Sequence, residues 1–129
     1  MNLHIGLKGE AGQVVTEHDI ASTYGSGLVD AYSTPALTAL IERACVNAIQ
    51  NFLGTGDTSV GVEVSLKHLA PTPVGMRVRA HSELVEIDGR RLRFKVKAAD
   101  DKEIIGEGSH VRVVVSFEGF AERVRNKLI

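Results

Sequence analysis

The pattern of hydrophobic and polar residues changes period once along the chain. Between residues 34 and 52, apolar side chains recur every three or four positions, which predicts about five turns of a helix that is mostly buried. From residue 60 onward, apolar and polar residues alternate, which is typical of strands with one buried face. The apolar positions of the predicted helix are Leu37, Leu40, Ile41, Ala44, Cys45, Ala48, Ile49 and Phe52.

Both ends of this helix carry recognisable signals. Thr34 suits the N-cap position, and Pro35 suits the first helical position because its missing N–H is not needed there. The sequence GTGD at 54–57 ends the helix. A short strand is predicted before it, at 13–18, and a loop rich in glycine and serine at 19–33.

The second half of the chain predicts four strands, at 60–67, 76–87, 90–98 and 103–117. Asp88-Gly89 is typical of a tight hairpin turn, and a change of phase at Leu84-Val85 indicates a β-bulge. Residues 118–129 predict a short amphipathic helix. A strand, a long helix and four strands in this order predict an α+β domain, with an antiparallel sheet packed on one hydrophobic helix.

Composition narrows the class of protein. A chain of 129 residues fits one domain, 1–129. Fifteen Lys and Arg against sixteen Asp and Glu leave a net charge of -1, which gives no general reason to expect nucleic acid or a membrane as partner. The single cysteine, Cys45, lies on the apolar stripe, so we expect it to pack in the core of a protein from a reducing compartment. With no signal peptide and no long apolar run, we expect a cytoplasmic protein.

One carboxylate interrupts the apolar helix. At about 100° per residue, Glu42 points away from the polar stripe that contains Arg43 and Asn47. No cation lies three or four residues away on either side, so a buried Glu42 would need partners from outside the helix. The alternative is a glutamate at the margin of the helix that reaches solvent or a subunit rim.

Two further side chains suggest chemistry. His68 ends the apolar face of the strand that starts at Val60, where the pattern would place an aliphatic residue. It is either a hydrogen-bonded core histidine or a functional one, and Thr34 is either a plain helix cap or a functional hydroxyl. A hydroxyl, a carboxylate and an imidazole together are the groups needed for acyl transfer or hydrolysis.

Three segments carry a resemblance to a known family: TPALTALIERACVNAI (34–49), TSVGVEVSLKHLAPTPVG (58–75) and VEIDGRRLRFKVKAADDKEIIGEGSHVRVVV (85–115). Over roughly residues 30 to 125, the chain resembles the fluoroacetyl-CoA thioesterases among the hot-dog fold thioesterases. The resemblance includes a glutamate eight residues after a threonine and the pattern Gly-x-Gly-x-His-x-Arg at 106–112. It implies a hot-dog fold, in which a curled antiparallel sheet wraps around one long helix, and a homodimer with active sites at the subunit interface.

The resemblance also implies roles for individual residues. Thr34, Glu42 and His68 match the catalytic threonine, glutamate and histidine of the family, and Gly61 matches the glycine whose backbone N–H binds the thioester carbonyl. The implied activity is hydrolysis of a small or medium acyl-CoA to the free acid and coenzyme A, without cofactor or metal. Glu42 would attack the carbonyl or position water. One segment departs from the family: GSGLVDAYS, at 25–33, has Gly25 and Leu28 near the places of the aromatic residues that gate the acyl pocket in the family.

Other interpretations remain open from the sequence. The chain could be a non-catalytic hot-dog dimer that binds acyl-CoA or another hydrophobic ligand. A hot-dog dehydratase is less favoured because no matching Asp/His pair is present. The four cations at 91–97 form either a solvated sheet face or a site for the phosphates of coenzyme A. His110 and Arg112 line either a ligand channel or subunit interface, or serve structural hydrogen bonds.

Overall fold

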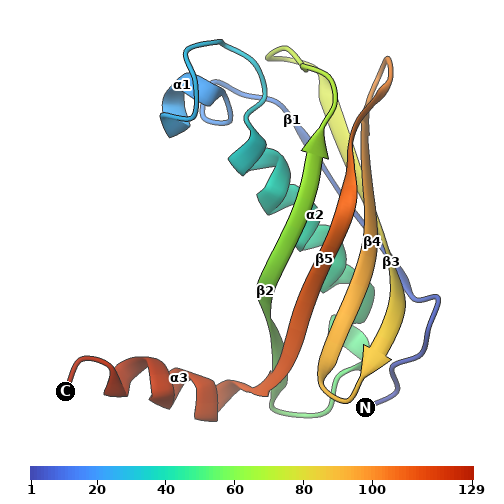
Figure 1. Cartoon of the computed structure of the whole chain (residues 1–129), viewed down its shortest axis with the longest axis vertical. Coiled ribbons are helices and arrows are strands. Elements are labelled where there is room, and N and C mark those ends of the chain that lie inside the picture. The colour runs from blue at the N-terminus through green and yellow to red at the C-terminus, as the bar shows by residue number, and fades with distance from the viewer.

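The computed structural model describes residues 1–129 and confirms the predicted architecture. A five-stranded antiparallel sheet curls around one long helix, α2, which lies along its concave side (Figure 1). The elements are β1 (Lys8–Val14), α1 (Ala21–Tyr24), α2 (Thr34–Ile49), a 3-10 turn η1 (Gln50–Phe52), β2 (Asp57–His68), β3 (Arg77–Asp88), β4 (Arg91–Asp100), β5 (Ile104–Ser116) and α3 (Phe117–Asn126).

The strand order is β1-β3-β4-β5-β2, so β1 and β2 form the two edges of the sheet. The hairpin between β3 and β4 turns at Gly89, whose φ of 61° lies in the left-handed region that glycine adopts without strain. The register between these strands shifts between Leu84 and Glu86, which confirms the predicted bulge. A second shift, between Gly61 and Glu63 in β2, was not predicted.

The core lies between α2 and the concave face of the sheet. The apolar stripe of the helix is buried from Leu37 to Ile49, and it packs against sheet residues that include Leu92 and Phe94. Cys45 belongs to this core, as predicted, and burial raises the pKa of its thiol to about 12. It therefore stays a neutral, packed side chain at physiological pH.

The start of α2 differs from the prediction. The N-cap is Ser33, whose Oγ accepts a hydrogen bond of 3.1 Å from the Ala36 N–H, and Thr34 is already the first helical residue. The prediction of Thr34 as the cap was therefore wrong. Because Ser33 caps the helix, the Thr34 hydroxyl is available for another partner.

Three further boundaries differ from the sequence-based ones. The first strand is Lys8–Val14 rather than 13–18, and a short helix, α1, occupies part of the predicted loop. The long helix ends at Ile49, so Phe52 belongs to η1 and is partly exposed. Both ends of α2 therefore lie within three residues of the predicted ones, whereas β1 is displaced toward the N-terminus.

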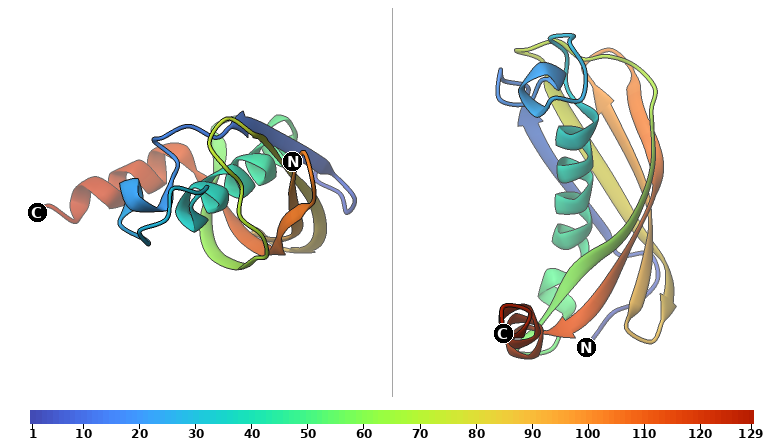
Figure 2. Two further views of the ribbon diagram at one scale, coloured as in Figure 1. Left: turned by 90° about the horizontal axis from the view of Figure 1, so that it is seen from above. Right: turned by 60° about the vertical axis from the view of Figure 1, so that its left-hand side comes forward.

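The predicted buried face of β2 is also wrong for the single chain. The Val62 side chain is 50% exposed and Val64 is exposed as well, because β2 is an edge strand and its bulge changes the phase of the alternation. The predicted C-terminal helix is confirmed as α3, but it projects away from the sheet, with Phe117 and Val124 exposed (Figures 1 and 2). The chain itself therefore leaves apolar side chains uncovered at this edge and on this helix.

Candidate functional site

Two of the predicted site residues form a direct pair at the N-terminal end of α2. The Thr34 Oγ1 lies 2.8 Å from the Nδ1 of His68, which is the last residue of β2. Thr34 is exposed, and His68 is half-buried. A hydroxyl at this distance from an imidazole nitrogen has the geometry of a nucleophile with its general base.

His68 is held in a form that suits a base. Burial lowers its pKa below the ordinary value, which favours the neutral imidazole at physiological pH. Neutral His68 accepts the Thr34 proton through Nδ1 if it carries its own proton on Nε2. The Nε2 atom is buried and has no hydrogen-bond partner within the chain. Thr34 is thus the only side chain that orients this imidazole.

An open groove of about 410 Å³ lies beside the pair. Its walls are Val29, Ala31 and Tyr32, which precede α2, and residues 69–71, which follow β2, with Thr34 and His68 between them. The lining is mostly apolar, and His68 is its only titratable side chain apart from Tyr32. The pair is therefore accessible to a ligand from an apolar surface.

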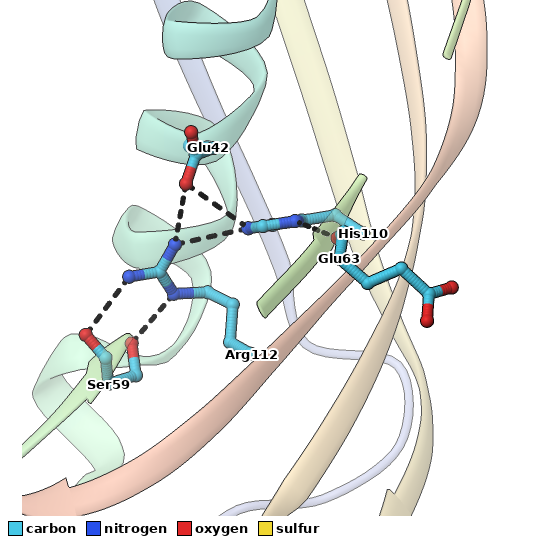
Figure 3. Close-up of polar contacts among 5 residues, drawn as sticks. All are labelled: Glu42, Ser59, Glu63, His110 and Arg112. Atoms are coloured by element: carbon cyan, nitrogen blue, oxygen red, sulfur yellow. Dashed lines mark hydrogen bonds and ion pairs between the residues drawn. The ribbon is translucent and has the colours of Figure 1, made fainter. Parts of the chain in front are cut away.

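Glu42 belongs to a different cluster, two turns further along α2 (Figure 3). Its Oε2 lies 3.5 Å from the Arg112 Nη1 and 3.8 Å from the His110 Nε2, and both partners are buried on β5. The Glu42 side chain is 40% exposed, so it lies at the helix margin and is paired from outside the helix. The sequence left two alternatives for Glu42, partners from outside the helix or a place at the helix margin, and the structure combines them.

Hydrogen bonds to the main chain fix the partners of Glu42. The His110 Nδ1 lies 2.8 Å from the Glu63 carbonyl, which can only accept, so Nδ1 carries the proton. Its Nε2 is then free to accept from the Arg112 Nη1 at 3.1 Å. Arg112 also donates to Ser59 twice, from Nε to Oγ at 2.8 Å and from Nη2 to the carbonyl at 3.0 Å.

The charges of this cluster are consistent with that arrangement. Burial lowers the pKa of His110, and the nearby Arg112 guanidinium lowers it further, so the imidazole is neutral. Burial also lowers the pKa of Arg112, and the Glu42 carboxylate opposes that change. Arg112 stays charged and is the cation that offsets the Glu42 carboxylate.

Gly61 of β2 faces the same carboxylate. A Cβ atom at this position would lie 2.6 Å from the Glu42 Oε2 and 3.1 Å from the His110 Cε1. The absence of a side chain therefore lets Glu42 approach β2 closely enough to reach Arg112. This gives Gly61 a steric reason to be glycine, beside the backbone role expected from the sequence.

The four predicted residues thus form two groups, Thr34 with His68 and Glu42 with Gly61. No hydrogen bond or ion pair joins the groups, and the eight residues between Thr34 and Glu42 span about 12 Å along the helix axis. Sequence reasoning left His110 and Arg112 out of the site and missed Ser59 altogether. The Gly-x-Gly-x-His-x-Arg pattern contains the first two and places them on the strand face of Gly106, where a Cβ atom would meet the Leu37 side chain of α2.

No group of three or more His, Cys, Asp and Glu side chains is arranged to hold a metal ion. No helix of the chain is long and apolar enough to cross a membrane.

Comparison with known proteins adds to this geometry. Residues 15–118 match the model of the family described as fluoroacetyl-CoA-specific thioesterase. The fluoroacetyl-CoA thioesterase of Streptantibioticus cattleyicolor is 38% identical over 98 residues, which cover 76% of this chain and 70% of that protein.

Solved structures show the same likeness. A variant of the fluoroacetyl-CoA enzyme in complex with acetyl-CoA superposes with a TM-score of 0.91 and 31% identity, covering 97% of this chain and 98% of that one. A hot-dog-like protein from Thermanaerovibrio acidaminovorans gives a TM-score of 0.86 at 26% identity, covering 95% of this chain and 91% of that one. The curled sheet around α2 is therefore the hot-dog fold.

Proposed function

The chain belongs to the family of fluoroacetyl-CoA-specific thioesterases and hydrolyses acyl-CoA to a free acid and coenzyme A, and on this premise we propose that it acts on small or medium acyl groups through Thr34, His68, Glu42 and Gly61. The observation that carries this proposal is the 2.8 Å contact between the Thr34 Oγ1 and the His68 Nδ1 beside an open groove. It places a hydroxyl, a base and space for a substrate together.

The first half-reaction uses the Thr34–His68 pair. His68 takes the proton of the Thr34 hydroxyl while the oxygen attacks the thioester carbonyl, and it then gives the proton to the sulfur of departing coenzyme A. The products of this step are free coenzyme A and an acyl ester of Thr34. In the second half-reaction, His68 takes a proton from water, which attacks the ester, releases the acid and restores Thr34.

Glu42 and Gly61 contribute from the second cluster. Their proposed roles are to position the attacking water with the Glu42 carboxylate and to stabilise the carbonyl oxygen with the Gly61 N–H. The roughly 12 Å that separates the two clusters along α2 favours an active site that takes one cluster from each of two subunits.

A homodimer built on the β2 edge would bring such clusters together. β2 pairs only with β5, so its outer edge presents unpaired backbone groups, and the exposed Val62 and Val64 lie on the same strand. A second copy of the chain would cover both. We also place the enzyme in the cytoplasm, because its single cysteine is a buried free thiol.

One experiment tests activity and shared sites together. Thiol release from a panel of acyl-CoAs is measured for the wild type, for Glu42→Ala and His68→Ala alone, and for the two variants unfolded and refolded as a mixture. We expect each variant alone to lose most activity. The mixture should recover about a quarter of it, because half of the dimers are mixed and each holds one intact site.

The outcomes separate the parts of the proposal. His68→Ala hydrolysing the best substrate as fast as the wild type would overturn the catalytic role of the pair. If neither variant regains activity in the mixture, the site lies within one subunit and the shared arrangement is wrong. His81→Ala serves as a matched control, because the exposed His81 contacts Glu10 at 3.5 Å, outside both clusters.

A further inference from the structure

The groove beside Thr34 and His68 has a mostly apolar lining, which suits an aliphatic chain. Val29 and Ala31 contribute one wall, and Leu69, Ala70 and Pro71 contribute the other. Val29 and Leu69 are largely exposed, although both lie next to the only hydroxyl–imidazole pair of the chain. Burying them against a ligand would remove apolar surface from water on both sides of the contact.

Three hydrogen-bond donors beside this groove are already used within the chain. The Tyr32 N–H donates to the Thr72 carbonyl at 2.8 Å, and the Leu69 N–H donates to the Ile105 carbonyl at 2.7 Å. The Tyr32 hydroxyl donates to the Gln13 side chain at 2.7 Å, and Pro71 has no N–H.

The mostly apolar walls decide which part of a thioester fits the groove. The pantetheine arm of coenzyme A carries two amides, which would lose hydrogen bonds with water here and gain few in return. An alkyl chain has no such bonds to lose. No Asp, Glu, Lys or Arg lines the groove, so a charged acyl group would gain no partner either.

We propose that this groove is the acyl-binding subsite, and that the enzyme prefers unsubstituted aliphatic acyl groups longer than acetyl, such as butyryl and hexanoyl. Val29 and Leu69 determine this preference. The inference rests on the proposed roles of Thr34 and His68, because both residues line the groove and their contact would fix the position of the reacting carbonyl.

The preference should appear as a regular dependence on chain length. Each methylene that enters the groove should raise kcat/KM by about two- to fourfold, the upper value corresponding to full burial at about 0.8 kcal/mol. The rise should end once the chain extends beyond Leu69 and Val29 into solvent.

The experiment measures kcat/KM of the wild type for acetyl-, butyryl-, hexanoyl- and octanoyl-CoA. It also measures the affinity of the His68→Ala variant for coenzyme A, acetyl-CoA and hexanoyl-CoA by calorimetry, which needs no turnover. Leu69→Ser is compared with Val124→Ser on α3, because the two residues are similarly exposed, at 52% and 57%. Val29→Ser is a second groove variant, and circular dichroism checks that each variant folds.

We expect affinity and kcat/KM to rise from acetyl to hexanoyl. The hexanoyl-to-acetyl ratio should fall at least fivefold in Leu69→Ser, fall in the same direction in Val29→Ser, and stay at the wild-type value in Val124→Ser. Equal affinities for coenzyme A and hexanoyl-CoA, or equal ratios in the groove and control variants, would overturn the subsite. Absence of thiol release from every acyl-CoA would instead overturn the proposed function, and the calorimetric series would still decide the subsite.

Discussion

The two polar clusters on α2 are built in different ways. Thr34 and His68 share one hydrogen bond at the exposed N-terminal end of the helix, and the His68 Nε2 has no partner. The Glu42 cluster is held by four hydrogen bonds and by the ion pair between Glu42 and Arg112, which together link α2, β2 and β5 (Figure 3). The first arrangement leaves room for a ligand to complete it, whereas the second fixes a charge in place.

The two clusters should therefore respond differently to substitution. Removal of a partner from the crowded cluster leaves buried polar atoms unsatisfied, so stability should suffer. Removal of a partner from the open pair exposes the remaining polar atom to the groove. We therefore expect catalytic activity to fall while the free energy of unfolding changes little. Comparing stability and activity in the same variants therefore tests whether the two clusters differ in this way.

The largest effect on stability is expected for Arg112→Leu. This change leaves the Ser59 Oγ, the His110 Nε2 and the Glu42 carboxylate without their shared donor. We expect the free energy of unfolding to fall by about 2–3 kcal/mol, less than for a fully buried pair because Glu42 is partly exposed. Urea unfolding measures it, and Arg93→Leu, which breaks an exposed pair with Glu86 at 3.2 Å, should cost less than about 1 kcal/mol. Equal costs for the two changes would mean that the cluster is not a rigid unit.

A smaller effect is expected from pH. The pKa values of His68 and His110 are both lowered by burial, so the unfolded chain binds protons more readily than the folded one. Their contribution to stability is therefore present above the unfolded pKa of about 6.5 and is lost as the pH falls below it. Urea unfolding at pH 7.5 and pH 5.5 should show this loss.

The same pH series separates the two histidines. The acid limb of kcat/KM should follow His68, because only its neutral form accepts the Thr34 proton. In His110→Phe, the pH dependence of unfolding should weaken while the acid limb of activity keeps its position. An acid limb that disappears in His110→Phe would instead assign the titration to the Glu42 cluster.

The smallest change in stability is expected for Gly61→Ala. The new Cβ meets the Glu42 Oε2, which is the far end of a flexible and partly exposed side chain, so the carboxylate can move aside. The free energy of unfolding should change by less than about 1 kcal/mol, since alanine also lowers the entropy of the unfolded chain. Activity should fall if the position of Glu42 matters, and unchanged kcat/KM would exclude a catalytic role for it. Urea unfolding measures the change in stability and thiol release measures the change in activity, both on one preparation of the variant.

Much of the fold could be predicted because local signals and tertiary packing agree. The apolar spacing from Leu37 to Ile49 predicted α2, and Asp88-Gly89 together with the phase change at Leu84 predicted the β3–β4 hairpin and its bulge. The predicted strand at 13–18 was misplaced because the real β1, KGEAGQV, has little apolar alternation and is set by pairing with β3. Register with a partner strand is information that no local pattern contains.

The sequence by residue type and spacing fixed the order of the long helix and the five strands, the apolar character of that helix, the absence of a cation near Glu42 on it and the family to which the chain belongs. These properties depend on residue types and their spacing. Catalytic roles for Thr34, Glu42 and His68, a substrate-binding role for Gly61 and the homodimer remain predictions.

Contacts between residues far apart in the sequence follow from the folded arrangement of the elements. This arrangement assigned the helix cap to Ser33 and so left the Thr34 hydroxyl to His68, and it gave Glu42 to Arg112 and His110 across the sheet. The curl of the sheet brings β2 and β5 to α2 at two separate points, and distances between such elements depend on strand register and twist. That is the physical reason why four residues chosen from the sequence form two clusters in space.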